Sequence, residues 1–540
     1  MAIAAAILLY LGRGAVYSID ELAWVIQSPD LDLRDALTPH NGHLLLSTRL
    51  IYKVILEVFG SGYLGFRILT VALTVLASGL LYIYVRRRVG PWVALAPSLV
   101  LLVFGSDSLH LMLGNGITIQ LALACGIGAL LAIDRDDLLG DITATVLLVL
   151  GCATYTIALA FVVGAAILVL LREDRWRRIW IPAVPLILYG TWWIWALGTS
   201  SDAEGQLVYS NLLTTPVWSL QALGAAVSAL TGTNYSFTGD SGSGARIVAV
   251  PLGLIAVAWL AWRAWRRPHA GVWAAAGIAL TLWGIQSVAR TPFGTPEIPR
   301  YLLPSAFVTV LLGAEAGRQI RWTRPALIAV FAVTAVGAMA NIALLRDNGA
   351  AQRVLVAPPL RAELSGLEIA GGETRPGFDP HRVLEGQNSL VFPFAEARVL
   401  RPDPALAYVQ AEERFGRIGY SPEELATQSD ALRAHADAVL AEALGVRLVP
   451  LAAGPRRGCR RLRAQTDGLT FAADAPGAVV VADRDNPVPI GLRRFSQTIT
   501  APIGTVAAGQ AAFLRVPPDH VPGRWQAAST ASALTLCSPP

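Results

Sequence analysis

Residues 66–106 read FRILTVALTVLASGLLYIYVRRRVGPWVALAPSLVLLVFGS, two apolar runs on either side of the triplet Arg86-Arg87-Arg88. The runs at 66–85 and 91–106 approach the roughly 20 apolar residues that a helix needs to cross a bilayer. Arginine clusters between such runs are typical of cytoplasmic loops. This stretch therefore predicts two transmembrane helices that are joined on the cytoplasmic side.

The same pattern continues along most of the chain. Further arginine clusters, at 172–178, 263–267 and 318–324, fall on the same side as 86–88 if every long apolar run crosses the membrane once. We therefore predict an α-helical polytopic membrane protein with about eleven transmembrane helices, in which the chain after residue 345 lies outside. The apolar runs are 1–17, 66–85, 91–106, 117–133, 138–153, 155–171, 179–197, 246–262, 271–289, 301–317 and 325–345.

The composition agrees with this class of protein. Of 540 residues, 54% are hydrophobic and 15% are charged, whereas an ordinary soluble chain is about 25% charged. The net charge of +5 invites a nucleic-acid interpretation, but the arginines cluster in short loops, where they orient the protein in the bilayer. We therefore expect a lipid bilayer and no nucleic acid as partner. The abundance of Ala, Arg, Gly and Val suggests a GC-rich bacterial genome. We expect the protein in the bacterial cytoplasmic (inner) membrane.

The chain after residue 345 loses the apolar runs and is long enough for one or two extracytoplasmic domains. Helix signals in 346–466 predict a mixed α/β region. Short β-like runs between Pro, Gly and Asp turns in 467–540 predict a β-sandwich. Cys459 and Cys537 are both expected outside, where disulfides persist, so we predict that they pair. Two free thiols are the alternative.

The first external loop, at 18–65, begins with the acidic pair Asp20-Glu21. Such a pair next to an apolar run is costly to hold beside lipid unless it is used. A carboxylate at the membrane face can take the proton of an acceptor hydroxyl as that hydroxyl attacks a sugar. The alternative is that Asp20 and Glu21 merely cap an interfacial helix whose N-cap is Ser18.

Basic and polar side chains follow later in the same loop. His40, Asn41 and His43 lie in the stretch PHNGH, and Arg49 and Lys53 lie on the polar side of an amphipathic stretch. An amphipathic helix of this kind lies along the lipid headgroups. Because His, Arg and Lys can hold a phosphate leaving group, we predict that these five residues bind substrate.

These features resemble the GT-C class of membrane glycosyltransferases. The resemblance rests on the first apolar run, the Asp20-Glu21 pair, the stretch from Pro39 to Arg49-Leu50-Ile51-Tyr52 and the many further runs, and it covers about 1–345. Members include protein O-mannosyltransferases, the aminoarabinose transferase of lipid A and the mycobacterial arabinosyltransferases. The resemblance implies a sugar donor on polyprenyl phosphate, transfer outside the membrane, and Asp20 as general base with Glu21 as its partner.

A metal site is a further expectation of this resemblance. Some GT-C members complete such a site with an acid in the loop that here occupies 106–116. Asp107 and His110, one helical turn apart, are the candidate ligands of a divalent cation (Mg, Mn or Ca). Ordinary loop polarity is the alternative, and the sequence makes no cofactor certain.

Three residues flank a Pro/Gly-rich external turn. Arg290, Arg300 and Tyr301 stand at the edges of apolar runs on the side away from the other arginine clusters. An arginine there can bind the lipid phosphate bidentately, or simply snorkel to the headgroups. The polar loop at 198–245 is expected either to cover a bound substrate or to be a connector.

Three functions compete. The first is an inverting glycosyltransferase that uses a polyprenyl-phosphate donor and a glycan (cell-wall polysaccharide), glycolipid or protein acceptor. The second is a transporter or flippase of a lipid-linked saccharide, which should carry ionisable groups or broken helices at mid-membrane. The third is a non-catalytic envelope assembly factor. The apolar runs are nearly free of charge and the acids gather at one face, which favours the first.

Overall fold

The computed structural model describes residues 1–199, 208–233, 243–266, 269–290, 294–380, 390–452, 457–464 and 468–539; the side chains of 19, 243–248 and 290 are outside the described part. The chain divides into two compact units. The membrane unit comprises 1–15, 31–52 and 63–351, and the C-terminal unit comprises 16–30, 53–62 and 352–540.

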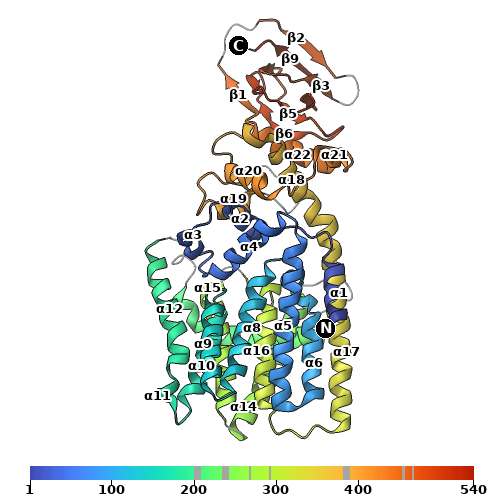
Figure 1. The fold of residues 1–540 in the computed structure, drawn as a ribbon. Helices are drawn as coiled ribbons and strands as arrows, with labels where there is room; N and C mark the ends of the chain where they lie inside the picture. The colour runs from blue at the N-terminus through green and yellow to red at the C-terminus, as the bar shows by residue number, and fades with distance from the viewer. Residues whose placement is uncertain are drawn as a thin grey trace. The chain divides into compact units, whose positions relative to one another are not determined.

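The membrane unit is helical throughout (Figure 1). Each of the eleven apolar runs coincides with a helix, so the predicted class, a helical membrane protein, is confirmed. Its elements are α1 (Ala2–Leu11), α3 (Leu33–Leu37), α4 (Leu46–Phe59, shared by both units), α5 (Leu64–Val89), α6 (Pro91–Leu102), η1 (Gly105–Asp107), α7 (Leu109–Met112), α8 (Gly116–Ile133), α9 (Leu138–Cys152), α10 (Ala158–Leu170), α11 (Arg175–Arg178), α12 (Trp180–Leu197), η2 (Tyr209–Thr214), α13 (Thr215–Thr231), α14 (Ser243–Arg266), α15 (Ala270–Arg290), α16 (Pro299–Ala316) and α17 (Arg324–Ala351).

The helices differ in how well they suit a full crossing. Among the described residues, five are long and apolar enough to cross a membrane: Leu64–Val89, Gly116–Ile133, Trp180–Leu197, Ala270–Ala289 and Arg324–Glu373. Four shorter apolar helices are Ala2–Leu11, Pro91–Asp107, Leu138–Cys152 and Ala158–Leu170. The apolar runs in α14 and α16 belong to neither group, so the predicted number of about eleven crossings stays a prediction for these two and for the shorter helices.

One helix, α13, lies where the sequence predicts only a polar loop. The segment that leads into it lies beside the end of α15, where the Val208 N–H donates to the Val288 carbonyl at 3.0 Å. The helix ends beside α17, where the Asn341 amide donates to the Ala229 carbonyl at 2.9 Å. Both neighbours lie toward the helix ends that are opposite the arginine-rich loops.

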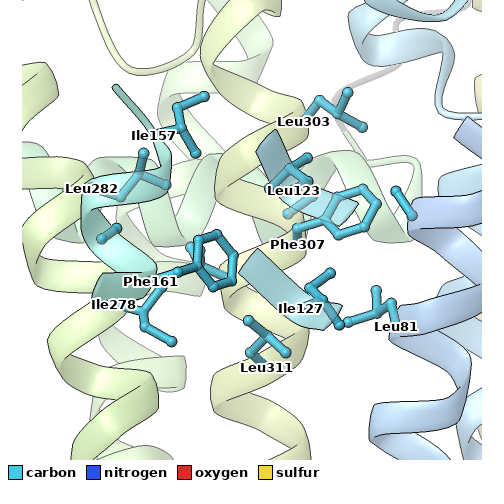
Figure 2. Close-up of a cluster of buried hydrophobic side chains, with 14 of the residues drawn as sticks. Leu81, Leu123, Ile127, Ile157, Phe161, Ile278, Leu282, Leu303, Phe307 and Leu311 are labelled. Atoms are coloured by element: carbon cyan, nitrogen blue, oxygen red, sulfur yellow. The ribbon is translucent and has the colours of Figure 1, made fainter. Parts of the chain in front are cut away.

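Small residues set the packing of the membrane unit. In Figure 2, Phe161 and Ile278 belong to its buried apolar cluster. The Phe161 ring lies directly against Gly126 of α8, and Ile278 lies directly against Gly164 of α10. A methyl group at either glycine would overlap the neighbouring side chain. Glycine lets helix backbones approach closely, which is the main route to helix association in lipid.

A buried carboxylate ties three helices together at the arginine-rich end. Glu315 of α16 is fully buried. It accepts hydrogen bonds from the Tyr84 hydroxyl at 2.6 Å and from Arg88, both on α5, and its second oxygen is 3.0 Å from His269 Nε2 and 2.6 Å from Arg318 Nε. A buried charge is tolerated when partners surround it in this way. Glu315 is thus a structural joint between α5, α16 and the start of α15.

The C-terminal unit begins with helices and ends in a β-sandwich. Its helical elements are α2 (Ile19–Gln27), the end of α4, η4 (Gln352–Val356), α18 (Ala357–Ala370), η5 (Gly371–Glu373), α19 (Val391–Ala397), α20 (Pro404–Phe415), α21 (Pro422–Ala426) and α22 (Asp430–Ala443). Its strands are β1 (Arg447–Leu451), β2 (Arg460–Arg463), β3 (Leu469–Ala472), β4 (Gly477–Val481), β5 (Val488–Arg493), β6 (Ala501–Val506), β7 (Ala511–Arg515), β8 (Gln526–Ser529) and β9 (Ala533–Cys537).

The strands form two antiparallel sheets, in the orders β1-β7-β4-β9-β2 and β3-β8-β5-β6. The predicted β-rich C-terminus is confirmed, but the sandwich starts earlier than residue 467. Strand β1 pairs with β7 from the Arg447–Arg515 pair onward, and β2 pairs with β9. Both strands are short: β1 (RLVPL) contains a proline, and β2 (RRLR) is arginine-rich, so neither shows the apolar alternation that marks a strand in a sequence.

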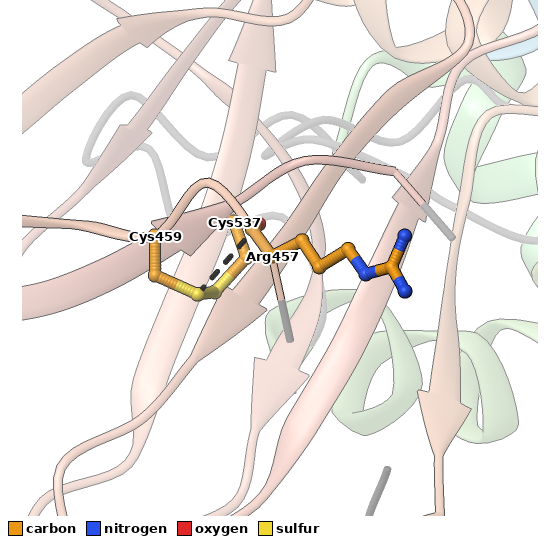
Figure 3. The surroundings of a disulfide bond; sticks show 3 residues. All are labelled: Arg457, Cys459 and Cys537. Atoms are coloured by element: carbon orange, nitrogen blue, oxygen red, sulfur yellow. Dashed lines mark hydrogen bonds between the residues drawn. A yellow bond between two sulfur atoms is a disulfide. The ribbon is translucent and has the colours of Figure 1, made fainter. Parts of the chain in front are cut away.

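The structure joins Cys459 to Cys537 in a disulfide, the pairing that the sequence predicts (Figure 3). Cys537 ends β9, and Cys459 immediately precedes β2, the partner strand of β9. The bond therefore reinforces the edge of the five-stranded sheet. Cys125 and Cys152 are buried thiols of the membrane unit.

Candidate functional site

Helix α2 places the acidic pair. Ser18 is its N-cap, and the Glu21 carboxylate accepts the Ser18 backbone N–H at 2.8 Å. Glu21 is fully buried. This is the reciprocal arrangement of a capping box, which satisfies backbone donors at the start of a helix. For Glu21 the structure thus favours the capping interpretation over a direct part in chemistry.

Helix α2 is held within the C-terminal unit, where it packs against α19 and α20. The side chains of its middle turn, from Leu22 to Ile26, are buried. Its last turn is fixed by hydrogen bonds, because Arg401 donates to the Gln27 carbonyl at 2.9 Å. The sequence predicts that the loop at 18–65 belongs to the membrane domain of 1–345, whereas the structure groups 16–30 and 53–62 with the C-terminal unit.

Asp20 lies beside a carboxylate that the sequence analysis missed. An oxygen of Asp20 is within 4.8 Å of an oxygen of Glu396 on α19, and both side chains are half-buried. The two residues are far apart in the chain, and Glu396 lies in a short helix with no motif around it. Two adjacent carboxylates can share a proton or hold a hard cation through their oxygens. Asp20 and Glu396 thus form a close pair of carboxylates within the C-terminal unit.

Lys53 binds backbone carbonyls at the C-terminal end of α2. Its ammonium donates to the carbonyls of Ser28 at 2.9 Å and Pro29 at 3.2 Å, and lies 3.9 Å from Glu57 one turn further along α4. Lysine near the last carbonyls of a helix stabilises that helix end. The contacts of Lys53 are thus structural ones, and its role in substrate binding stays a prediction.

The residues predicted to bind substrate in 40–43 form a tight hairpin in the membrane unit. His40 and His43 exchange two backbone hydrogen bonds, at 3.0 and 2.9 Å. Between them, Asn41 and Gly42 have φ values of 50° and 77°. An Asn-Gly pair with both φ values positive is the preferred sequence of a two-residue turn. Asn41 is therefore a turn residue.

His43 is anchored to the start of α10. Its Nδ1 lies 2.7 Å from the Thr156 hydroxyl, and its ring is 4.4 Å from the Tyr155 ring. Thr156 in turn lies 3.3 Å from the Tyr189 hydroxyl on α12. The hydrogen bond to Nδ1 fixes the orientation of the imidazole and directs Nε2 away from it.

Arg49 is buried and organises the preceding loop. Its guanidinium donates to the carbonyls of Asp35 at 2.6 Å and of Thr38. Only 2% of Arg49 is exposed. These hydrogen bonds position the loop that leads to His40. Because Arg49 is buried, it has almost no exposed surface with which to contact a substrate.

Asp107 and His110 form a pair, in keeping with their spacing. Nδ1 of His110 is 2.8 Å from both carboxylate oxygens of the fully buried Asp107. Within the described part of the chain, no third His, Cys, Asp or Glu ligand joins them. The pair thus offers one carboxylate and one imidazole to a cation, and its predicted role as a metal site stays a prediction. A carboxylate on Nδ1 also leaves Nε2 as a proton acceptor.

Tyr301, at the start of α16, has a partner that the sequence analysis missed. Its ring lies 6.1 Å from that of Trp218 on α13, and the exposed Arg300 guanidinium lies 5.1 Å from the Tyr301 ring. The Tyr301 hydroxyl and the Trp218 indole N–H are buried and have no hydrogen-bond partner within the described residues. Such groups call for a bound water or ligand. The side chain of Arg290 lies outside the described residues.

Comparison with known proteins gives a likeness of fold. No protein-family model matches the chain, and no curated protein sequence matches it. A crystal structure of ArnT from Cupriavidus metallidurans bound to undecaprenyl phosphate is 14% identical, with a TM-score of 0.44 over 76% of this chain and 87% of that one. The apo structure of the same protein is 14% identical, with a TM-score of 0.46 over 84% and 95%. Neither of these two likenesses assigns the chain a donor or an acceptor.

Proposed function

We propose that this chain is a membrane glycosyltransferase that moves a sugar from a polyprenyl-phosphate donor to an acceptor hydroxyl on the extracytoplasmic side. The observation that carries the proposal is the position of Asp20. It stands on a helix whose start is capped and whose end is fixed, with the Glu396 carboxylate within 4.8 Å. A rigid carboxylate with a second acid beside it suits proton transfer better than a solvated surface charge.

The reaction is a single displacement with inversion at the anomeric carbon. The acceptor oxygen attacks the anomeric carbon of the sugar, and Asp20 takes the proton of that hydroxyl as general base. The bond between the anomeric carbon and the phosphate oxygen breaks, and its electron pair leaves with the polyprenyl phosphate. The acceptor is a glycan, a glycolipid or a protein that presents a free hydroxyl.

Asp20 and Glu396 fit a divalent cation as well as a shared proton. Their carboxylate oxygens are close enough to face one ion, and Mg, Mn and Ca all prefer oxygen ligands. When bound, such an ion would offset the negative charge of the leaving phosphate. The chain's own residues hold the two carboxylates in place, since Glu21 caps α2 and Arg401 bonds its last turn.

The test is transfer in membranes from cells that make the wild type, Asp20→Asn or Asp30→Asn, supplied with a panel of radiolabelled polyprenyl-phosphate sugars. Asp30 is an exposed acid of the same unit and serves as the matched control. We expect label in a glycan, lipid or protein fraction with the wild type and Asp30→Asn, and none with Asp20→Asn. Undiminished transfer by a well-folded Asp20→Asn protein would contradict the proposal.

The same experiment separates the competing functions. A transporter would move labelled donor across sealed vesicles without altering its glycosidic bond, and Asp20→Asn would leave that movement intact. An assembly factor would support envelope synthesis in cells with either acid replaced, since a scaffold needs no general base.

A further inference from the structure

The net charge of the chain is concentrated in its last segment. Residues 447–540 hold eleven arginines and no lysine, against five aspartates and no glutamate. This excess of six positive charges exceeds the +5 of the whole chain, so the remaining residues together are slightly acidic. The orienting arginines of the transmembrane loops therefore do not account for the basic character of the protein. The β-sandwich is a basic module, and basic modules attract polyanions.

Four of these arginines lie along one edge of the five-stranded sheet. Arg460, Arg461 and Arg463 belong to β2, the last strand in the order β1-β7-β4-β9-β2, and Arg457 comes just before it. All four side chains are exposed. In Figure 3 the Arg457 side chain extends away from the disulfide. We call these four residues the β2 arginine row.

Most of the β2 arginine row has no acidic partner. Arg461 pairs with Asp483 at 2.8 Å. Within the described part of the chain, no carboxylate forms an ion pair with Arg457, Arg460 or Arg463. Charged side chains also protect a sheet edge from pairing with another strand. Protection needs one or two charges, whereas here four arginines occur within seven residues.

The row is also held rigidly. Strand β2 pairs with β9 over Arg460–Leu536 to Arg463–Ala533, and the Cys459–Cys537 disulfide fixes the start of the strand to the same neighbour. Arg461 and Arg463 point to one face of the sheet, about 6.7 Å apart along the strand. Charges fixed in advance lose less entropy on binding than charges on a flexible tail.

We propose that the β2 arginine row binds an acidic glycan, a chain of sugars that carries carboxylates at regular intervals. The arginine fork suits carboxylates and forms two parallel hydrogen bonds with each. The disulfide indicates an oxidising compartment, where nucleic acid is not the expected polyanion. The row contains no aromatic residue and so lacks an anchor for a bilayer. The proposal goes beyond sugar transfer and stands whether or not Asp20 is catalytic.

The experiment measures binding of a fluorescein-labelled polygalacturonate oligosaccharide to the full chain in detergent micelles by fluorescence anisotropy. The uncharged comparison ligand is the same oligosaccharide with its carboxylates methyl-esterified. The test variant is Arg461→Gln/Arg463→Gln, which removes the two arginines that point to one face of the sheet. The matched control is Arg447→Gln/Arg515→Gln, which removes the same charge from the opposite part of the same sheet, where these two residues face each other across β1 and β7. Disulfide formation and an unchanged Tm show that each variant is folded.

We expect the test variant to raise Kd about tenfold or more, as the loss of two charge-assisted contacts predicts. The control should raise Kd much less, and the esterified oligosaccharide should not bind. Equal losses in both variants would show diffuse attraction to net charge and overturn the site. A test variant that binds the acidic glycan as tightly as the wild type would also overturn the site. Tighter binding of a DNA oligonucleotide or of phosphatidylglycerol vesicles than of the acidic glycan would overturn it too.

Discussion

Asp430 and Asp437 lie two turns apart on α22, and both carboxylates accept backbone N–H groups from the single loop that joins β5 to β6. Asp430 accepts those of Gln497 at 2.6 Å and Thr498 at 2.9 Å. Asp437 accepts those of Arg494, Phe495 and Ser496, each at 2.9 Å. The last helix and the β-sandwich are thus joined through two aspartates. The pKa of Asp437 is raised and that of Asp430 is lowered.

The first prediction concerns the stability of this joint against pH. Burial raises the pKa of Asp437 from 3.8 to about 6. A carboxyl whose folded pKa is raised favours folding in its protonated form, so its contribution is complete below pH 3.8 and is lost as pH rises toward 6. We expect Asp437→Asn, which stays neutral, to abolish this loss. Thermal unfolding at several pH values between 4 and 7 measures this loss of stability. Parallel curves of Tm against pH for the wild type and the variant would contradict the prediction.

The contribution of Asp430 to stability should depend on pH in the opposite sense, so Asp430 serves as an internal comparison. Its hydrogen bonds to the loop backbone and to the Thr498 hydroxyl hold its pKa below the usual range. Its contribution to stability is therefore present above the unfolded pKa and is lost as pH falls through the folded value. Asp430→Asn should flatten the acid side of the stability curve, and not the region that Asp437 controls.

The second prediction separates the two members of the acidic pair. If Glu21 is a helix cap, Glu21→Gln keeps an acceptor oxygen for the Ser18 N–H and retains most transfer activity. Glu21→Ala loses the cap and lowers the free energy of unfolding by about 1 kcal/mol. Asp20→Asn should leave Tm unchanged and abolish transfer. A Glu21→Gln protein with wild-type Tm and no activity would show instead that Glu21 takes part in chemistry.

The third prediction concerns packing inside the membrane unit. Gly126→Ala places a methyl group where the Phe161 ring lies, so the two helices must move apart or the ring must turn. Overpacking of this kind costs about 1–3 kcal/mol. We expect a lower Tm for Gly126→Ala in detergent and recovery in the double variant Gly126→Ala/Phe161→Leu. A matched control is Gly313→Ala, because nothing lies within 4 Å of the added methyl there.

The transmembrane helices could be predicted from sequence because each rests on a local signal, the length of an apolar run. Helix α13 could not, since its sequence TPVWSLQALGAAVSALT mixes Ser, Thr, Gln and Gly with small apolar residues. Its stability comes from close contact instead, with Gly224 directly against the Ala249 backbone. Tertiary packing of this kind leaves no periodic trace in the chain.

Of the two acids at the candidate site, only Asp20 could be predicted from the sequence, for a related reason. Asp20 stands next to an apolar run, where an acidic residue is unusual. Glu396 stands among polar neighbours in a region of ordinary composition, and only the packing of α19 against α2 brings it to Asp20. The capping role of Glu21 is visible as an alternative in Ser18 followed three residues later by Glu, and the structure adds the hydrogen bond that such a cap requires.

The last prediction tests Glu396 directly. If it assists Asp20, Glu396→Gln should lower kcat/KM for transfer by about a hundredfold, the scale of a lost acid/base group, and leave Tm unchanged. Glu413→Gln replaces an exposed acid on α20 of the same unit and should be neutral. If the two carboxylates hold a cation, EDTA should inhibit the wild type but not slow the Glu396→Gln protein further, because both changes remove the same ion. Additive effects would place any required cation elsewhere, and full activity of Glu396→Gln would leave Asp20 to act without it.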